Sequence, residues 1–481
     1  MAEQQGVAET AAPQAPGGTT SSPFKIAGRV FSILLPLAFW FAPLGLDKTV
    51  HHALAITLFM IAAWITEAFD HAITGFIGCY LYWVLGVVRF PQAFSGFAND
   101  TAWFLFGAIL FGMMAMKSGL ARRVAYLIMR VVGTSYARIL LGMIIVDFVL
   151  TFFVPSAISR VVILFALGMG LMEIFGLGKG SNVGRGMFMM LTYLSNIFDK
   201  MIIAGASSIT SVGLIKSIGK VEVLYSRWTL AFLPCSILTI FIGWRLALWL
   251  YPPEVKELPG GDAYFRQEIA KMGHMSVLEM KSALFLALAL GLWLTDSLHH
   301  MSPSMVGLGV GLLATIPGIG VLDVEDVKKV NYLPIFFVAA ALSMGEVLVS
   351  TKALDVMTNS MFLWMEPFIH GSFGTTMVLY WTGFFYHFFL ASEISMVATS
   401  TPLVMKFALA KGMNPLILGM IWTFGSGAKI FVYQSGVMIA GYAYGYFETK
   451  DMFKVGLWLS VIESLILLGL VAVYWPMLGY R

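Results

Sequence analysis

Two short stretches, far apart in the chain, share the pattern Ser-x-Ile-Ser: PSAISR at 155–160 and ASEISM at 391–396. Both lie in largely apolar surroundings, where hydroxyl groups and a carboxylate are costly unless they have a partner. Serine hydroxyls and the free backbone N–H groups of a helix start can bind an anion. The carboxylate of Glu393 could bind a cation, carry a proton or anchor a lysine, and we rank the anchoring role first. The pattern therefore predicts two related halves of one binding site.

A second repeated feature is a lysine inside an apolar segment of each half. DKMIIAGAS at 199–207 aligns without a gap on AKIFVYQSG at 428–436, which places Lys200 over Lys429. A charge near the centre of a bilayer costs at least about 2.5 to 3.5 kcal/mol, so it normally faces a cavity or a partner. Both lysines are therefore candidate functional residues.

The composition requires a membrane for these segments. Of the 481 residues, 59% are hydrophobic and only 12% are charged, against about 25% charged in soluble domains. Apolar runs close to the length of a membrane span occur at 28–46, 49–68, 101–116, 228–251, 281–297 and 455–475. In other apolar segments, at 135–175, 186–219, 374–410 and 414–446, polar residues interrupt the run, so the ends of the membrane spans are harder to define there. We expect about eleven crossings.

Charges in the loops predict the orientation. The densest basic stretch holds Lys117, Arg122, Arg123, Arg130 and Arg138, and positive loops face the cytoplasm. The polar tail at 1–23 has a disordered composition and no secretory signal pattern. We expect a multi-pass protein of the plasma (inner) membrane with a cytoplasmic N-terminus.

The chain divides at a polar, Pro/Gly-rich connection at 251–276. Residues 24–250 would form a first helix and a first repeat with its tip near Ser156, and residues 277–481 a second repeat with its tip near Ser392. The segment 102–124 also resembles 334–356 in its aromatic start and small-residue centre. Internal symmetry of this kind is typical of secondary transporters, which bind substrate between their repeats.

The order of these motifs resembles the divalent anion/sodium symporter family, the carriers of dicarboxylates, citrate and sulfate. The likeness spans about 50–478 and includes FSGFANDTAWFLF at 94–106, FVPSAISR at 153–160, ASEISMVATSTP at 391–402 and YGYFETKDMFKVG at 444–456. It implies an all-α polytopic protein with two inverted repeats, each holding a re-entrant hairpin and a broken helix. It also implies a homodimer and an elevator-type transport domain.

The resemblance places the substrate at the hairpin tips and the broken-helix loops. The implied binding residues are Ser156, Ala157, Ile158, Ser159, Ser207, Ser208, Ser392, Glu393, Ile394, Ser395, Ser435 and Gly436. Helix packing is an equal alternative for the serines of the loops, and Arg160, Asp147 and His387 are more simply explained as packed, satisfied residues. Sodium near Ser156, Gly205 and Ser392 is conceivable, but we expect no dedicated metal site and no cofactor.

The chain departs from the family where sodium and carboxylates are held. Ala157–Ile158 and Glu393–Ile394 replace the Asn-Thr pairs of the tips, and Phe198–Asp199 and Ala428–Lys429 replace Gly-Gly pairs of the broken helices. We favour the hypothesis that the ammonium groups of Lys200 and Lys429 stand in for sodium ions. The alternative is structural pairing, of Lys200 with Asp199 or another carboxylate and of Lys429 with Glu393. A site so neutralised would suit a monoanion or zwitterion.

The expected function is secondary transport of a small organic anion of the di- or tricarboxylate type, with reduced or absent sodium dependence and with sodium or a proton as coupling ion. Carriers or exchangers of sulfate, sulfonates or monoanions, and an anion channel or sensor, are the alternatives. Motifs of enzymes, including HExxH and GxSxG, do not occur, and neither Cys79 nor Cys235 belongs to a CxxC pair. The expected partners are the bilayer, a small anion and a second copy of the chain, with no nucleic acid.

Overall fold

The computed structural model describes residues 23–152, 154, 156–257, 261–361, 363–390 and 392–480. The tail at 1–23, apart from Pro23, lies outside the described residues, as do Pro155 and Arg481. Within the described residues the chain is helical and contains no strand. This agrees with the predicted all-α polytopic class.

The helices of the first half are α1 Pro23–Phe41, α2 Lys48–Ile65, α3 His71–Val84, α4 Phe90–Ala93, η1 Ser95–Ala98, α5 Asp100–Ser118, α6 Leu120–Val132, α7 Tyr136–Thr151, α8 Ala157–Phe175, α9 Asn182–Met201, α10 Ala206–Gly219 and α11 Tyr225–Leu250. Those that follow are α12 Gly261–Met272, α13 Val277–Leu294, α14 Asp296–His299, α15 Pro303–Leu313, α16 Val324–Lys328, α17 Leu333–Ser350, α18 Ala353–Met361, η2 Leu363–Phe368, α19 Gly371–Tyr386, η3 His387–Phe389, α20 Glu393–Ala410, α21 Pro415–Gly425, η4 Val432–Gln434, α22 Gly436–Ala443, α23 Thr449–Gly469, the π-helical turn η5 Leu470–Tyr474 and α24 Trp475–Met477.

Eight helical segments of the described chain are long and apolar enough to cross a membrane, and α9 with α10 counts as one of them. Three shorter apolar helices, Ile26–Phe41, Pro303–Leu313 and Pro415–Gly425, lie beside them. The polar connection at 251–276 contains a helix, α12, which packs against α6. Its Glu268 pairs with Arg122 of α6 at 3.2 Å.

The same order of elements occurs in both halves. Helix α5 ends at Gly119 and α17 is followed by Lys352, and both residues have a positive φ, of 82° and 65°. Each then leads to a second helix, a helix hairpin, an interrupted helix and a long helix: α6 to α11 in one half and α18 to α23 in the other. The likeness of 102–124 to 334–356 thus marks equivalent turns.

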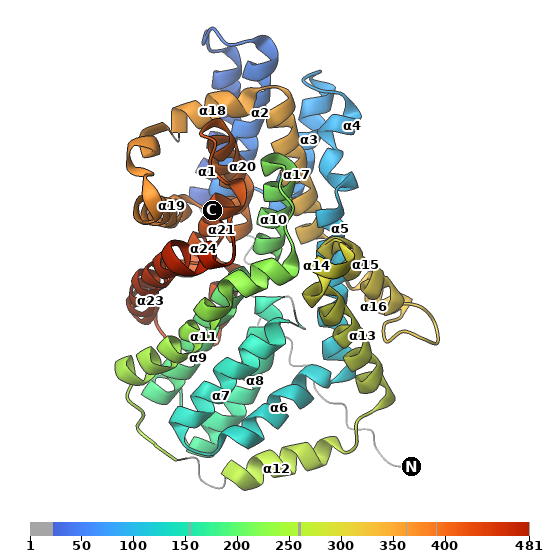
Figure 1. Ribbon diagram of the computed structural model, residues 1–481, viewed down its shortest axis with the longest axis vertical. Helices are drawn as coiled ribbons and strands as arrows, with labels where there is room; N and C mark the ends of the chain where they lie inside the picture. The colour runs from blue at the N-terminus through green and yellow to red at the C-terminus, as the bar shows by residue number, and fades with distance from the viewer. Residues whose placement is uncertain are drawn as a thin grey trace.

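Contacts between the halves also occur in matched pairs. Helix α3 packs on α17 as α15 packs on α5, and α8 packs on α22 as α20 packs on α10. Figure 1 shows α7, α8 and α9 in the lower part of the molecule and α19, α20 and α21 in the upper part. The interrupted ends of both groups meet between them.

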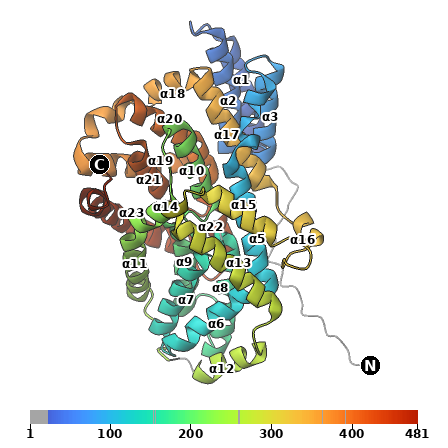
Figure 2. The same ribbon diagram turned by 45° about the vertical axis from the view of Figure 1, so that its right-hand side comes forward.

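Helix α15 lies beside α5 (Figure 2), and small residues allow their close packing. A Cβ added to Gly311 of α15 would lie 3.0 Å from Cα of Gly107 in α5, so these helices touch backbone to backbone. On the other side, the backbone N–H of Gly96 donates a hydrogen bond of 2.9 Å to Oγ of Ser343 in α17. Gly307 and Gly311 of α15 therefore allow the close contact with α5, as small residues do at helix contacts in membrane proteins.

Candidate functional site

Two helix hairpins reach the middle of the molecule with their tips. Helices α7 and α8 form one, and α8 begins at Ser156, whose Oγ accepts a hydrogen bond of 3.3 Å from the backbone N–H of Ser159. Helices α19 and α20 form the other, and α20 begins after Ser392. Both serines have extended backbones, with φ of −143° and −130°. Each Ser-x-Ile-Ser motif therefore marks a helix N-terminus.

Two interrupted helices face these tips. Helix α9 ends at Met201 and α10 starts after Gly205, where Oγ of Ser208 donates to the carbonyl of Gly205 at 3.0 Å. Helix α21 ends at Gly425 and α22 starts after Ser435, whose Oγ accepts from the N–H of Val437 at 3.2 Å. Because a helix start leaves backbone N–H groups without intrahelical partners, each interruption adds a second anion-binding end.

The four N-termini border one cavity of about 310 Å³. Each tip lies against the interrupted helix of the opposite half, because α8 packs on α22 and α20 packs on α10. A Cβ added to Gly436 would lie 3.3 Å from Cδ1 of Ile158, which shows how closely the first tip approaches α22. The cavity is lined by Leu105, Ile109, Ser156, Ala157, Ile158, Asn196, Asp199, Gly205, Ala206, Ser207, Pro334, Ser392, Glu393, Ile394, Ser435, Gly436 and Val437.

Glu393 joins the two candidate lysines behind this cavity. Its Oε1 lies 2.5 Å from Nζ of Lys200, and its Oε2 lies 3.0 Å from Nζ of Lys429. Lys200 is 1% exposed and Lys429 is fully buried. The carboxylate at the second tip thus holds one lysine from each half of the chain, which corresponds to the anchoring role.

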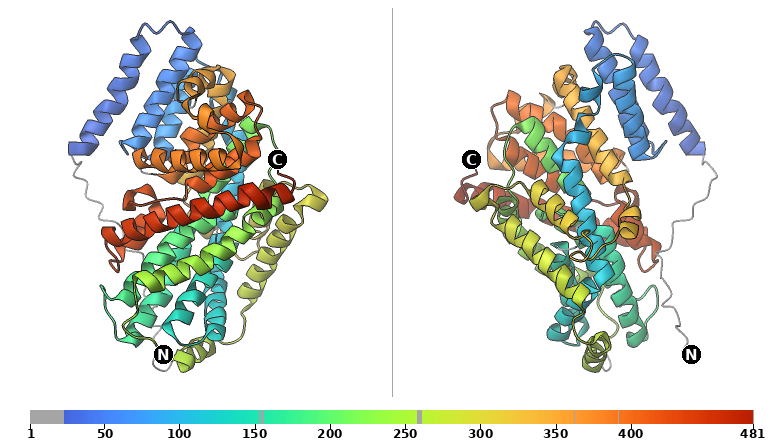
Figure 3. Two further views of the ribbon diagram at one scale, coloured as in Figure 1. Left: turned by 60° about the vertical axis from the view of Figure 1, so that its left-hand side comes forward. Right: turned by 90° about the vertical axis from the view of Figure 1, so that its right-hand side faces the viewer.

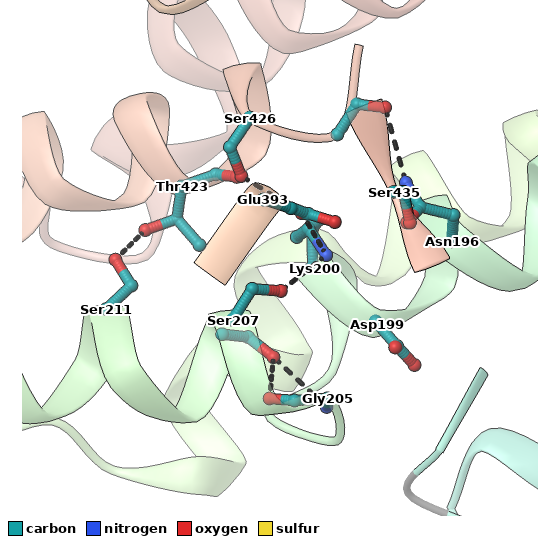
Figure 4. Close-up of polar contacts among 12 residues, drawn as sticks. Asn196, Asp199, Lys200, Gly205, Ser207, Ser211, Glu393, Thr423, Ser426 and Ser435 are labelled. Atoms are coloured by element: carbon teal, nitrogen blue, oxygen red, sulfur yellow. Dashed lines mark hydrogen bonds and ion pairs between the residues drawn. The ribbon is translucent and has the colours of Figure 1, made fainter. Parts of the chain in front are cut away.

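Further polar groups complete this cluster. Nζ of Lys200 donates to Oγ of Ser207 at 2.9 Å, and Nζ of Lys429 donates to the carbonyl of Ser426 at 3.0 Å. The side-chain amide of Asn196 is oriented so that both of its polar atoms are hydrogen-bonded. Its nitrogen donates to Oε2 of Glu393 at 3.1 Å, and its oxygen accepts from Nζ of Lys429 at 2.5 Å. Figure 4 shows Lys200 pointing at Glu393 while its neighbour Asp199 points away.

Asp199 belongs to a second cluster, around Arg160. The guanidinium of Arg160 donates to Oδ1 of Asp147 at 3.0 Å and to Oδ1 of Asp199 at 2.7 Å. It also donates to the carbonyls of Val154 and Ser195. The possible pair of Lys200 with Asp199 is therefore not formed, because Arg160 takes this carboxylate and Glu393 takes the lysine. Arg160 and Asp147 are packed and satisfied, as expected.

The two clusters are balanced in charge as a whole. The Lys200–Glu393–Lys429 cluster has one positive charge in excess, and the Asp147–Arg160–Asp199 cluster has one negative charge in excess. Buried charges without a partner are strongly unfavourable, so this balance stabilises the fold. The positive charge in excess in the Lys200–Glu393–Lys429 cluster, next to the cavity, adds to the attraction that the four helix ends exert on an anion.

Several predicted residues lie outside the cavity lining. Oγ of Ser159 donates to Oγ of Ser156 at 3.1 Å, and Ser208 holds the backbone of Gly205. Ser395 is fully buried, and its hydroxyl has no hydrogen-bond partner among the described residues. Lys200 and Lys429 act on the cavity through Glu393. The other predicted binding residues meet at the cavity wall.

Sequence reasoning missed two polar residues. Asn196 lies in α9, one turn before Lys200, and nothing in its local sequence distinguishes it from a packing residue. Glu463 of α23 is 3% exposed and carries no motif, although a lone carboxylate in an apolar helix is itself a signal. Nε2 of His387 donates a hydrogen bond of 3.0 Å to the carbonyl of Gln434, so the ring packs against the loop before α22.

Comparison with known families gives one match over nearly the whole chain. The family model described as the sodium:sulfate symporter transmembrane region matches residues 25–480. This range includes both hairpins, both interrupted helices and all the charged residues of the two clusters.

Curated relatives align over most of their own length. A membrane protein of Cupriavidus necator is 27% identical over 91% of this chain and 90% of its own. The citrate/succinate antiporter of Escherichia coli K12 is 25% identical over 80% of each chain. The chloroplastic dicarboxylate transporter 1 of Arabidopsis thaliana is 25% identical over 93% of this chain and 82% of its own.

Proposed function

The chain belongs to the sodium:sulfate symporter family of membrane transporters, and from this premise we propose that it moves small di- or tricarboxylates across a membrane. Two of the relatives described above carry a transport name: one is an antiporter of citrate and succinate, and the other is a dicarboxylate transporter. Their substrates are carboxylates, which fits the cavity described above. The chain is a transporter and not an enzyme.

The convergence of four helix N-termini on one cavity carries this proposal. Each helix end has a partial charge of about +0.5 elementary charge, so four ends give about +2, which matches a dicarboxylate. Serine hydroxyls at three of these ends, Ser156, Ser392 and Ser435, add hydrogen-bond donors. The buried ionic groups do not oppose this attraction, because their charges cancel.

We further propose that transport needs little or no sodium. Lys200 and Lys429 are buried beside Glu393 at the N-terminus of α20, close to the interruptions of α9–α10 and α21–α22. A fixed ammonium about 5 Å from a carboxylate contributes on the order of 3 kcal/mol at an effective dielectric constant of 20. Sodium near Ser156, Gly205 or Ser392 stays the alternative.

Fixed charges also favour exchange over net uptake. An ion that dissociates can leave an empty carrier neutral, whereas Lys200 and Lys429 stay with the protein. The four helix ends remain unsatisfied when the cavity is empty. Reorientation of the empty carrier should therefore be slow, and bound substrate should accelerate it.

The proposed architecture consists of two inverted repeats in a homodimer, with an elevator-type movement and about eleven crossings. The matched contacts of α3 with α17 and α15 with α5 support the repeats. The tips at Ser156 and Ser392 would travel with the interrupted helices as one unit. We also propose that the chain lies in the plasma membrane with its N-terminus in the cytoplasm. The orientation is inferred from the basic stretch at 117–138.

The test is counterflow in proteoliposomes that contain the full chain. Preloading with unlabelled succinate or citrate should accelerate uptake of labelled succinate at least about tenfold over empty vesicles. The same assay with sulfate, a sulfonate and a monocarboxylate in place of succinate tests the alternative substrates. Among these alternatives, the balance of the buried charges favours a monoanion. Uptake that neither saturates nor responds to preloading would indicate a channel, and binding without flux would indicate a sensor.

A further inference from the structure

Glu463 is a buried carboxylic acid, and no positive side chain of the described residues forms an ion pair with it. It lies in the middle of α23 and is 3% exposed. Its Oε1 accepts a hydrogen bond of 2.6 Å from Oγ1 of Thr239, and Sγ of Cys235 donates to Oε2 at 3.5 Å. No ion pair of Glu463 occurs among the described residues.

The two donors come from one face of α11. Cys235 and Thr239 are four residues apart, so they lie one above the other on the helix, and α23 runs along α11 in the left view of Figure 3. Both are neutral groups, and the nearest lysine of the site, Lys429, is already paired with Glu393. An ionised carboxylate here would be a buried charge without a counter-charge, which proteins avoid.

A small cavity of about 10 Å³ borders the acid on its other side. Besides Glu463 it is lined by Tyr193 of α9, Tyr380 of α19, Ser460 of α23 and the loop residues Gly427 and Ala428. Both tyrosine hydroxyls donate to carbonyl oxygens, Tyr193 to Lys429 at 2.5 Å and Tyr380 to Ser460 at 2.9 Å. They are therefore committed elsewhere and do not neutralise Glu463.

The hydroxyl group of Ser460 in this cavity can accept a further hydrogen bond. Oγ of Ser460 is fully buried and makes no hydrogen bond among the described residues, which is unusual for a buried hydroxyl. A protonated Glu463 carries an O–H group that needs an acceptor. Ser460 offers one from the adjoining wall of the same cavity.

Glu463 is linked by packing contacts to Lys429, which lies in the interruption between α21 and α22. Gly456 lies two turns before Glu463 on the same face of α23, and a Cβ at Gly456 would collide with the carbonyl of Lys429. Tyr193 accepts a hydrogen bond of 3.0 Å from the N–H of Lys429 and donates to its carbonyl. A change at Glu463 therefore reaches the loop that holds Lys429 through packed backbone.

From these contacts we propose that Glu463 is a proton-binding site, and that its proton is carried together with the substrate. On loading, a hydronium ion of the aqueous phase transfers its proton to one carboxylate oxygen and becomes water. On the opposite side that O–H bond breaks and the proton returns to a water molecule. A metal cation is disfavoured, because it requires several oxygen ligands and the cavity accommodates no more than about one water molecule. The groups that face the acid are Thr239, Cys235, Tyr193, Tyr380 and Ser460.

This inference rests on the proposed transport function, but its test distinguishes the two. In empty proteoliposomes, where the wild-type chain takes up labelled succinate slowly, an inward proton gradient should raise this net uptake at least about threefold, and added succinate should make the outer medium more alkaline. Glu463→Gln should keep succinate counterflow within about twofold of wild type but lose both proton responses. Glu448→Gln, an exposed acid at the start of the same helix, should keep them.

The proton itself can be observed without transport. Difference infrared spectra of the full chain in detergent, recorded across a pH series, should show the carbonyl band of a protonated acid that disappears in Glu463→Gln. Proton-driven uptake that survives in Glu463→Gln, stimulation by a sodium gradient alone, or the absence of this band would each overturn the assignment. Loss of counterflow in wild-type protein would instead overturn the transport function, while the infrared band would still decide on Glu463.

Discussion

Lys200 and Glu393, which come from opposite halves of the chain, form an ion pair of 2.5 Å in the interior. The same carboxylate also holds Lys429 at 3.0 Å. One acid at a hairpin tip thereby fixes the positions of both interrupted helices relative to the cavity. Several measurable consequences follow from this arrangement and from its neighbours.

Removing the shared carboxylate should destabilise the protein. Glu393→Gln leaves two buried ammonium groups without their counter-charge, and breaking a buried pair costs about 3 to 5 kcal/mol. Thermal unfolding in detergent should show a clearly lower midpoint. Asp355→Asn is the control, because its pair with Lys406 at 2.8 Å is partly exposed to solvent and should cost no more than about 1 kcal/mol. Equal midpoints for both variants would contradict this expectation.

The buried Lys200 should be required for transport. Lys200→Met removes a fixed charge worth about 3 kcal/mol to a bound carboxylate, which corresponds to roughly a hundredfold loss of succinate counterflow at low substrate. Lys216→Met alters a half-exposed pair with Asp100 and should change counterflow little. Counterflow should be measured on protein matched for thermal stability. A Lys200→Met protein that folds and transports normally would remove the lysine from the mechanism.

Sodium should have little influence on the wild-type protein. Replacing sodium by choline on both sides of the vesicle should change the rate of succinate counterflow by less than about twofold, since the ammonium groups are covalently part of the site. The rate should be measured across a series of sodium concentrations. A strong, saturable dependence would show that an ion binds near Ser156, Gly205 or Ser392.

The turn before α10 should tolerate no side chain. A Cβ at Gly205 would collide with the carboxylate of Asp199, so Gly205→Ala must displace either the helix start or the pair of Asp199 with Arg160. We expect at least about a tenfold loss of counterflow, because the displaced helix start is one of the four anion-binding ends. Gly309→Ala is the matched control, as no atom lies within 4 Å of its added Cβ. Similar activity of both variants would argue against the role of Gly205.

Lysine should not replace Arg160. The guanidinium spans Asp147, Asp199 and two backbone carbonyls with separate N–H groups, which a single ammonium cannot reach together. Arg160→Lys should lower the unfolding midpoint nearly as much as Arg160→Met. A full rescue by lysine would mean that charge alone holds this cluster.

The sequence allowed the fold class to be predicted, and it indicated which motifs lie at one cavity, because apolar runs and paired motifs are local features. The role of these residues in binding stays a prediction. Ser156 and Ser392 were found as partners from their shared pattern, and Lys200 and Lys429 from a gapless alignment. The membrane class and the family agree with these predictions. The repeats, the dimer and the sodium dependence stay predictions.

Pairing of charges could not be predicted from the same evidence. Asp199 precedes Lys200 directly, yet adjacent residues of a helix point in different directions, and the structure gives Asp199 to Arg160. Glu393 was matched to Lys429 from the motifs, while its shorter contact, with Lys200, depends on how α20 packs on α10. The contacts of Asn196 and Glu463 could not be predicted either, because they also depend on how distant helices pack together.

The crosswise packing of the tips has a consequence for how the chain can be divided. Neither half contains a complete wall of the cavity, because α8 needs α22 and α20 needs α10. Cutting the connection at 251–276 would therefore produce two fragments that are obligate partners rather than two independent proteins. The boundary at 251–276 therefore separates two halves that depend on each other's contacts. A chimaera that combines halves of two different relatives would also have to keep the contact surfaces of α8 with α22 and of α20 with α10 compatible.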